Sequence, residues 1–314
     1  MVVIITEKDI EMISKAGKIA SEIKRIIPSI VRPGVPYTKI AETIENEIRN
    51  RGGEPAFPCN ISWGHEAAHY SPFQDDTRTV PSEGVIKIDF GVSIDGYLSD
   101  TSVSIDLSGE NEDLLKASQE ALDKAISIIE PGIPIREISS VIEKTIKSYG
   151  LKPVSNLTGH AMERYRLHAG ISIPNVDSNT KGTLRPGMLV AIEPFTTRGI
   201  GMVVNGDVVN IYSFSRPLDK RGKRMAGRLA SVLEKLYHTR RGLPFSERWL
   251  YTELVNKKVS NPLTTIREVL SLLRTRRYLN DYPVLIEPTG LQVAQSEDTV
   301  LVLDKEVIVT TRES

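Results

Sequence analysis

The segment KIDFGVSIDGYLSDT, residues 87–101, carries two aspartates that fall on one face of a predicted β-hairpin. Its central Asp95-Gly96 pair suits a two-residue type I′ turn. With that turn, Asp89 and Asp100 become diagonal neighbours with Cα atoms about 7–8 Å apart, so their carboxylates can converge on a cation. For this pair alone, an alternative stays open in which Asp100 caps a turn and Asp89 faces solvent.

Three further residues have the chemistry to complete a metal site with this pair. Glu193 follows the apolar run of residues 188–192, where a charged group needs a partner. Taken singly, Glu297 is compatible with a surface glutamate and His160 with an ordinary histidine. Oxygen-rich sites with one imidazole favour manganese, iron(II), cobalt or zinc. Two such ions would activate a bridging water and polarise a carbonyl, and they would keep neighbouring carboxylates ionised.

The elements that must position these residues repeat along the chain. Pro33-Gly34 and Pro131-Gly132 lie 98 residues apart, each followed by matching isoleucines, and Ile88-Asp89 matches Ile192-Glu193 at an offset of 104. Helices are predicted over residues 6–30, 38–50 and 111–129, and strands over residues 85–92, 97–106 and 188–195. Chance recurrence of proline-glycine pairs is the alternative, but the run of matched positions favours an internal duplication. We therefore expect an α+β fold of two pseudo-symmetric halves with a cleft between them.

A basic segment interrupts this repeat. Residues 216–280 contain 16 Lys/Arg against 5 Asp/Glu, although the whole chain is balanced at 40 of each. Leucine-rich helical patterns over residues 224–237, 246–255 and 262–277 predict a three-helix insertion. Strands are expected to resume over residues 282–286, 291–295 and 299–309. The predicted domains are a catalytic domain of residues 1–213 and 281–314 and a helical insertion of residues 214–280.

Composition sets the broad class of the protein. At 314 residues, with 40% hydrophobic and 25% charged side chains, the chain has the character of a globular protein. No apolar run reaches the length of a membrane span. The start MVVIITEKDI lacks the basic region and long apolar core of a secretory signal, and Cys59 is the single cysteine. We expect a cytoplasmic protein, with Cys59 an ordinary thiol.

In this order and context, the residues Asp89, Asp100, His160, Glu193 and Glu297 resemble the metal ligands of the methionine aminopeptidases, which have the pita-bread fold. Supporting motifs are AAHYSP at 67–72, GHAMERYRLHAG at 159–170, AIEPF at 191–195 and AQSED at 294–298. The resemblance covers essentially the whole chain, and the insertion, which is winged-helix-like in that class, is similar to that of the type II enzymes in their archaeal form. It implies a metal-dependent hydrolase that removes the initiator methionine from nascent proteins.

The same resemblance implies a role for each ligand. Asp89 would bind one divalent ion, His160 and Glu193 the other, and Asp100 and Glu297 would bridge or complete both shells. Glu193 would also carry a proton from water to the leaving amine.

Four other residues match non-ligand positions of the family. His69 and His168 would contact the scissile amide and stabilise the developing oxyanion. Phe57 and Leu167 would form the wall of an apolar slot for the methionine side chain. Ser296 stands where type II members often carry an aromatic residue, so the preference for the second substrate residue is not implied.

Two rival functions fit parts of the pattern. An Xaa-Pro aminopeptidase or dipeptidase of the same fold would share the five ligands, but it would not explain the insertion. A non-catalytic relative that binds RNA or ribosomal partners would explain the basic segment, but such relatives typically lose ligands. For the enzyme itself we expect nascent peptides with N-terminal methionine as partners, docking near the ribosome through residues 216–280, no membrane or DNA partner, and a monomer.

Overall fold

The computed structural model describes residues 5–313 of the chain. The prediction that the chain has no secretory signal depends partly on residues 1–4, which lie outside that range. The first described helix, α1, begins at the predicted capping box, in which the Thr6 hydroxyl accepts from the Asp9 amide and the Asp9 carboxylate accepts from the Thr6 amide. The elements of the first half are α1 (Glu7–Ile30), α2 (Tyr37–Asn50), β1 (Glu54–Pro55), β2 (Asn60–Trp63), β3 (Glu66–Ala68), β4 (Val85–Ile94) and β5 (Tyr97–Asp106).

The second half repeats the first, which confirms the predicted duplication. Its elements are α3 (Glu112–Ser127), α4 (Ile135–Ser148), β6 (Lys152–Pro153), β7 (Thr158–Met162), β8 (Ser172–Pro174), β9 (Leu189–Ile192) and β10 (Phe195–Thr197). The amide of Gly34 donates to Val80 at 2.8 Å, and the amide of Gly132 donates to Leu184 at 2.7 Å. The prolines that precede α2 and α4 also form equivalent bridges, to Thr79 and Thr183. Both halves therefore use the same turn to start their second helix.

The basic segment forms more helices than the sequence predicts. It lies between two long paired strands, and its elements in order are β11 (Val204–Phe214), α5 (Lys220–Ala226), the 3-10 turn η1 (Gly227–Leu229), α6 (Ala230–Arg240), β12 (Phe245–Ser246), α7 (Arg248–Asn256), α8 (Pro262–Thr275) and β13 (Leu279–Ile286). The prediction of one helix over 224–237 is wrong, because the chain breaks at Gly227, whose φ of 53° does not continue a helix. The helical character of the insertion is confirmed.

The remaining strands also depart from the predicted bounds. They are β14 (Val293–Gln295), β15 (Asp298–Val302) and β16 (Val307–Val309), so the predicted strand 299–309 is a hairpin. The predicted strand 188–195 is divided into β9 and β10 at Glu193-Pro194, where proline lacks the amide that a continuous ladder requires.

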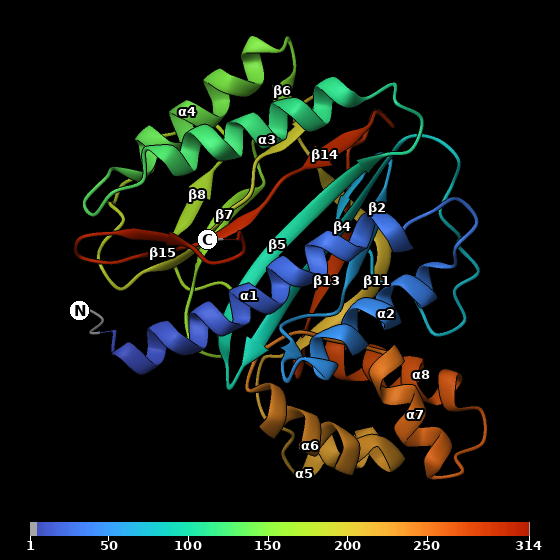
Figure 1. The fold of residues 1–314 in the computed structure, drawn as a ribbon. Coiled ribbons are helices and arrows are strands. Elements are labelled where there is room, and N and C mark those ends of the chain that lie inside the picture. The colour runs from blue at the N-terminus through green and yellow to red at the C-terminus, as the bar shows by residue number, and fades with distance from the viewer. Residues whose placement is uncertain (1–4, 314) are drawn as a thin grey trace.

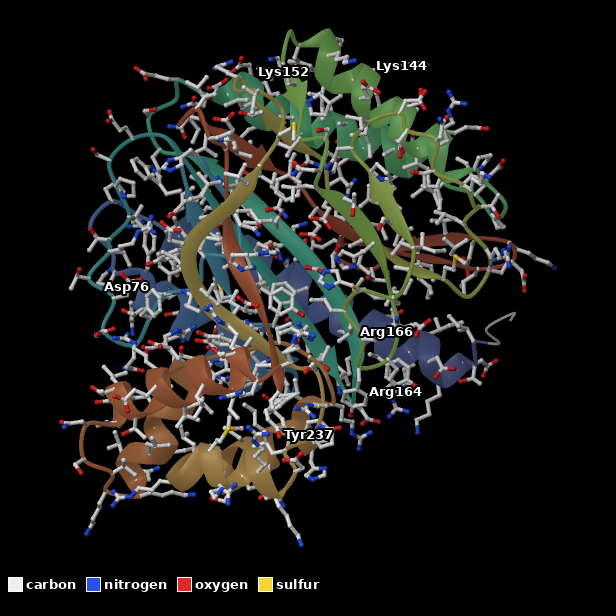
Figure 2. The ribbon with its side chains drawn as sticks, turned by 180° about the vertical axis from the view of Figure 1, so that it is seen from behind. Asp76, Lys144, Lys152, Arg164, Arg166 and Tyr237 are labelled. Carbon is white, nitrogen blue, oxygen red and sulfur yellow. The ribbon has the colours of Figure 1, made fainter. Side chains whose placement is uncertain are left out.

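The halves form a layered α+β fold, as predicted. The helices α1 and α2 cover the strands of the first half, and α3 and α4 cover those of the second (Figure 1). The insertion helices lie together at one end of the molecule in both views (Figure 1, Figure 2). One apolar core lies between α1, α2 and β4, and a second lies between α3, α4 and the sheet of β7, β9 and β15. The insertion has its own apolar cluster. Among residues 5–313, no helix has both the length and the apolar character needed to cross a bilayer.

Candidate metal centre

The β4–β5 hairpin has the predicted register. Asp100 lies opposite Gly91, and Asp89 lies opposite Ser102. The turn residues Asp95 and Gly96 have φ values of 49° and 84°, as a type I′ turn requires. The two carboxylates therefore belong to one face of the hairpin.

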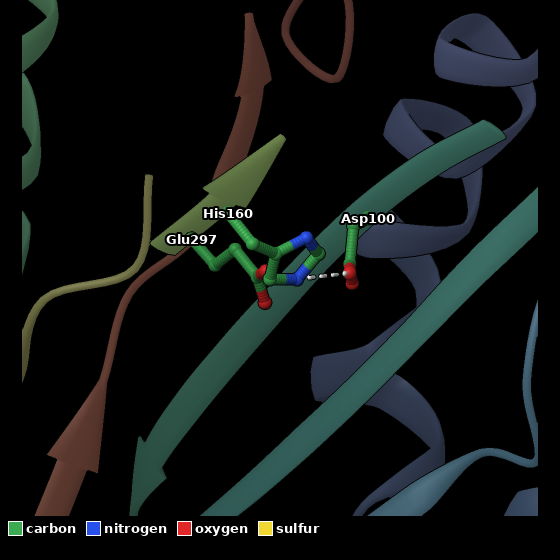
Figure 3. A group of neighbouring side chains, drawn as sticks. All are labelled: Asp100, His160 and Glu297. Atoms are coloured by element: carbon green, nitrogen blue, oxygen red, sulfur yellow. Dashed lines mark ion pairs between the residues drawn. The ribbon is translucent and has the colours of Figure 1, made fainter. Parts of the chain in front are cut away.

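Residues from both halves meet at this face. Ligand atoms of Asp100 on β5, His160 on β7 and Glu297 before β15 lie within 4.8 Å of one another (Figure 3). The Nε2 atom of His160 is 3.5 Å from an Asp100 oxygen and 3.5 Å from an Oε1 atom of Glu193. Asp89 lines the same cavity as these four residues. All five predicted ligands are thus in one place, although 208 positions separate the first from the last.

Hydroxyl groups connect the strands that bear the two central acids. The Thr299 hydroxyl donates to the Asp100 carbonyl at 2.7 Å, and the Thr101 hydroxyl donates to the Glu297 carbonyl at 2.7 Å. These reciprocal bonds fix the strand of the first half against the strand of the second. The backbone carbonyl of each acid is therefore held by a threonine hydroxyl from the segment that carries the other acid.

A close backbone approach positions His160. A Cβ atom at Gly159 would lie 2.4 Å from the Ala191 carbonyl oxygen, so only glycine allows β7 to pack this tightly on β9. That packing pairs His160 with Ala191, two residues before Glu193.

In the absence of cations, each acid disfavours the ionised form of its neighbours. Burial, and then repulsion from neighbouring acids, raises the pKa of Asp89, Glu193 and Glu297 well above the ordinary range. Burial raises the pKa of Asp100 to about 7. One carboxylate oxygen of Asp89 and one of Asp100 are buried without a hydrogen-bond partner among residues 5–313. No Lys or Arg within that range forms an ion pair with any of the four. This donor set fits divalent cations, which supply the missing positive charge.

Both predicted non-ligand histidines lie in the same cavity. The ring of His168 is 4.4 Å from that of His160, centroid to centroid, and His69 Nδ1 lies 3.1 Å from the Pro283 carbonyl oxygen. Desolvation inside the cavity lowers the pKa of the half-buried His69 to about 4, and it also lowers the pKa of His168, whose side chain is more exposed. A carbonyl only accepts, so we assign the proton of neutral His69 to Nδ1, which leaves Nε2 as an acceptor.

The cavity has a volume of about 210 Å³ and an apolar side. Phe57 and Leu167, which the resemblance assigns to a methionine slot, both line it. The sequence did not point to its other apolar lining residues, which include Ile211, Pro244, Phe195, Tyr282 and Leu285. Of these residues only Phe195 falls in a quoted motif, AIEPF at 191–195, and Pro244 comes from the insertion.

One residue near the acids was also missed. The Asn60 side-chain amide donates to an Asp89 oxygen at 3.4 Å. Its position opposite Asp89 in the β2–β4 ladder could have identified it, had the pairing of these strands been known.

Comparison with known proteins agrees with this geometry. Residues 11–239 match the model of metallopeptidase family M24. Methionine aminopeptidases of Methanocaldococcus jannaschii and Saccharolobus solfataricus are 43% and 39% identical to the chain, and the alignments cover 96% and 98% of the chain and 98% and 99% of those proteins.

Solved structures share the fold. A methionine aminopeptidase of Thermotoga maritima superposes with a TM-score of 0.70 at 20% identity, and the match covers 100% of both chains. A thermophilic Arx1 superposes with a TM-score of 0.78 at 16% identity, covering 99% of this chain and 92% of that one. The buried acids and histidine, the pita-bread fold and the full-length sequence similarity together place the chain in metallopeptidase family M24, among the methionine aminopeptidases.

Proposed function

We propose that the chain hydrolyses the peptide bond after an N-terminal methionine, with Asp89, Asp100, His160, Glu193 and Glu297 as ligands of two divalent ions. The observation that carries this proposal is that four acids, of which Asp100 and Glu297 are fully buried, and one imidazole line a single cavity with an apolar side. Such a site combines a cation pair with a slot for an uncharged side chain.

The cations and the side chains have separate roles in the proposed reaction. Two ions of cobalt, manganese, iron(II) or zinc would polarise the scissile carbonyl and activate water. Glu193 takes a proton from the attacking water and delivers it to the leaving amine as the C–N bond breaks. The 3.5 Å separation of Glu193 Oε1 from His160 Nε2 supports this role.

The two non-ligand histidines act on the substrate amide. His69 Nε2 carries a lone pair, so in its neutral form it accepts a hydrogen bond from an N–H of the substrate. His168 retains one N–H as a neutral imidazole and donates it to the carbonyl oxygen as negative charge develops there. Low pKa values keep both rings neutral at physiological pH.

Phe57 and Leu167 contribute to the pocket for the first side chain. Both line the cavity that also contains the acids. An unbranched thioether fits an apolar slot and makes favourable contacts with an aromatic ring.

The decisive experiment is release of methionine from Met-Ala-Ser. Chelated protein should be inactive and should regain activity with manganese, cobalt, iron(II) or zinc. Glu193→Gln should stay inactive with every metal, while Glu163→Gln, a change of an exposed glutamate on the β7–β8 connection, should retain activity. An active chelated protein would refute the metal-dependent mechanism.

The rival activity is cleavage before proline. Prolidase of Pyrococcus furiosus has the same fold, with a TM-score of 0.60 at 18% identity. The fold therefore does not distinguish the two activities, and a comparison of substrates is needed. We expect Met-Ala-Ser to be cleaved far faster than Xaa-Pro peptides, and the reverse order would replace our assignment. Failure to bind any divalent metal would instead favour a non-catalytic binding protein.

The basic insertion, residues 216–280, is proposed to dock the enzyme near the ribosome. Arg274, Arg276 and Arg277 are exposed at the end of α8, where they can reach phosphate groups. Co-sedimentation with ribosomes should weaken with salt and with charge reversal of these three residues. We also infer a cytoplasmic monomer, which light scattering and cell fractionation would check.

A further inference from the structure

One arginine of the insertion is buried against the catalytic half of the molecule. Arg240, the last residue of α6, is 8% exposed and forms no ion pair with a carboxylate among residues 5–313. Its guanidinium donates to three backbone carbonyls, those of Pro55 at 2.6 Å, Pro244 at 2.8 Å and Ala56. The Trp249 ring lies 5.2 Å from its Cζ atom. A buried cation is costly, so this arrangement requires the three carbonyls to stay where they are.

Those carbonyls belong to two segments that contribute to the wall of the cavity. Ala56 directly precedes Phe57, and both Phe57 and Pro244 line the cavity. The planar guanidinium reaches both segments at once, one from the first half and one from the insertion. One side chain therefore links these two parts of the wall directly.

A second contact from the insertion holds the same segment further along. Arg248 on α7 pairs with the buried Glu45 on α2 at 2.8 Å, and the other Glu45 oxygen accepts from Trp249 at 2.8 Å. Glu45 also accepts from the Cys59 amide at 3.2 Å. Residues 55–59 are thus fixed at one end by Arg240 and at the other by Glu45, which Arg248 orients.

We propose that Arg240 is a positioning residue that sets the width of the pocket for the first substrate side chain, so that the insertion controls selectivity at that residue. This inference rests on the proposed function. Removing the guanidinium leaves the carbonyls of Ala56 and Pro244 without this donor, and the wall that carries Phe57 loses its direct link to the insertion. A looser slot discriminates less well between methionine and other apolar side chains.

The test measures selectivity in the metal-loaded full chain. The kcat/KM for Met-Ala-Ser is divided by that for Leu-Ala-Ser, for wild type, Arg240→Met and Arg240→Lys. This ratio does not depend on how much of the protein is folded, so mere destabilisation leaves it unchanged. We expect Arg240→Met to lower the ratio about tenfold, chiefly through KM for Met-Ala-Ser. Arg240→Lys keeps a charge but lacks the planar fork, so it should be intermediate.

A matched control separates positioning from stability. Leu270→Ala removes a fully buried side chain from the apolar cluster of the insertion, away from the cavity, and should destabilise the protein while leaving the ratio at the wild-type value. If Arg240→Met does not fold, Arg240→Lys decides. An unchanged ratio in the folded Arg240 variants would overturn the inference while the proposed function stands. A wild type that does not cleave Met-Ala-Ser would refute the proposed function itself.

Discussion

His69 offers a test of the cavity that does not depend on catalysis. Its backbone has a φ of 68°, its Nδ1 atom bonds the Pro283 carbonyl, and its pKa is lowered by burial from 6.5 to about 4. The unfolded chain therefore binds more protons than the folded one between these values. It follows that the His69 contribution is complete above pH 6.5 and that stability is lost as the pH falls toward 4.

The magnitude follows from the size of the shift. A change from 6.5 to about 4 corresponds to at most about 3 kcal/mol. The imidazole keeps part of its surface open to the cavity, so solvent screening reduces the difference, and about 1–2 kcal/mol is expected. His69→Asn removes the titrating group, and asparagine tolerates the left-handed backbone.

The assay compares urea unfolding of chelated wild type and His69→Asn at pH 7.5 and pH 4.5. Other groups titrate in both proteins and cancel in the difference. Between pH 7.5 and pH 4.5, the free energy of unfolding should fall by about 1–2 kcal/mol more in wild type than in the variant. His238→Asn, on an exposed position of α6, controls for loss of an imidazole as such. Equal losses in wild type and His69→Asn would refute the buried, neutral state of this ring.

Three further predictions follow from single contacts. Chelation should lower the melting temperature of wild type, because bound ions stabilise the folded state, and Asp100→Asn should reduce this effect by weakening metal binding. Calorimetry with added manganese measures both proteins, and an equal rise in melting temperature in the two would contradict the prediction. Arg248→Met should cost about 3–5 kcal/mol in urea unfolding, since it strands the buried Glu45 carboxylate, and a Glu45→Gln/Arg248→Met double variant should recover part of that loss. Gly159→Ala should lower activity and cost about 1–3 kcal/mol, because its Cβ meets the Ala191 carbonyl; a wild-type melting curve would contradict this.

Local signals in the sequence were sufficient for several elements. The Asp95-Gly96 turn determines the register of its own hairpin, because both residues must adopt positive φ and the pairing then follows by counting. The Thr6 capping box and the repeated proline-glycine turns are equally local. Such signals depend on neighbours within a few residues, which is why they can be read without the fold.

Breaks inside elements were less accessible to sequence reasoning. A helical pattern continues through Gly227, yet the chain turns there to bring α6 onto the apolar cluster of the insertion. Similarly, the alternating pattern after Thr299 does not reveal where β15 turns back into β16. In both cases packing against distant residues outweighs the local preference.

The sequence by itself determined which side chains were available to bind cations and how Asp89 and Asp100 share a face. Only the tertiary structure decided that His160 and Glu297 join Asp100 within 4.8 Å. Only the tertiary structure, too, brought Arg240 of the insertion to the wall of the cavity. The physical reason is that hydrogen bonding within a hairpin is fixed by the turn that closes it, whereas contacts between residues far apart in the chain depend on how whole layers pack.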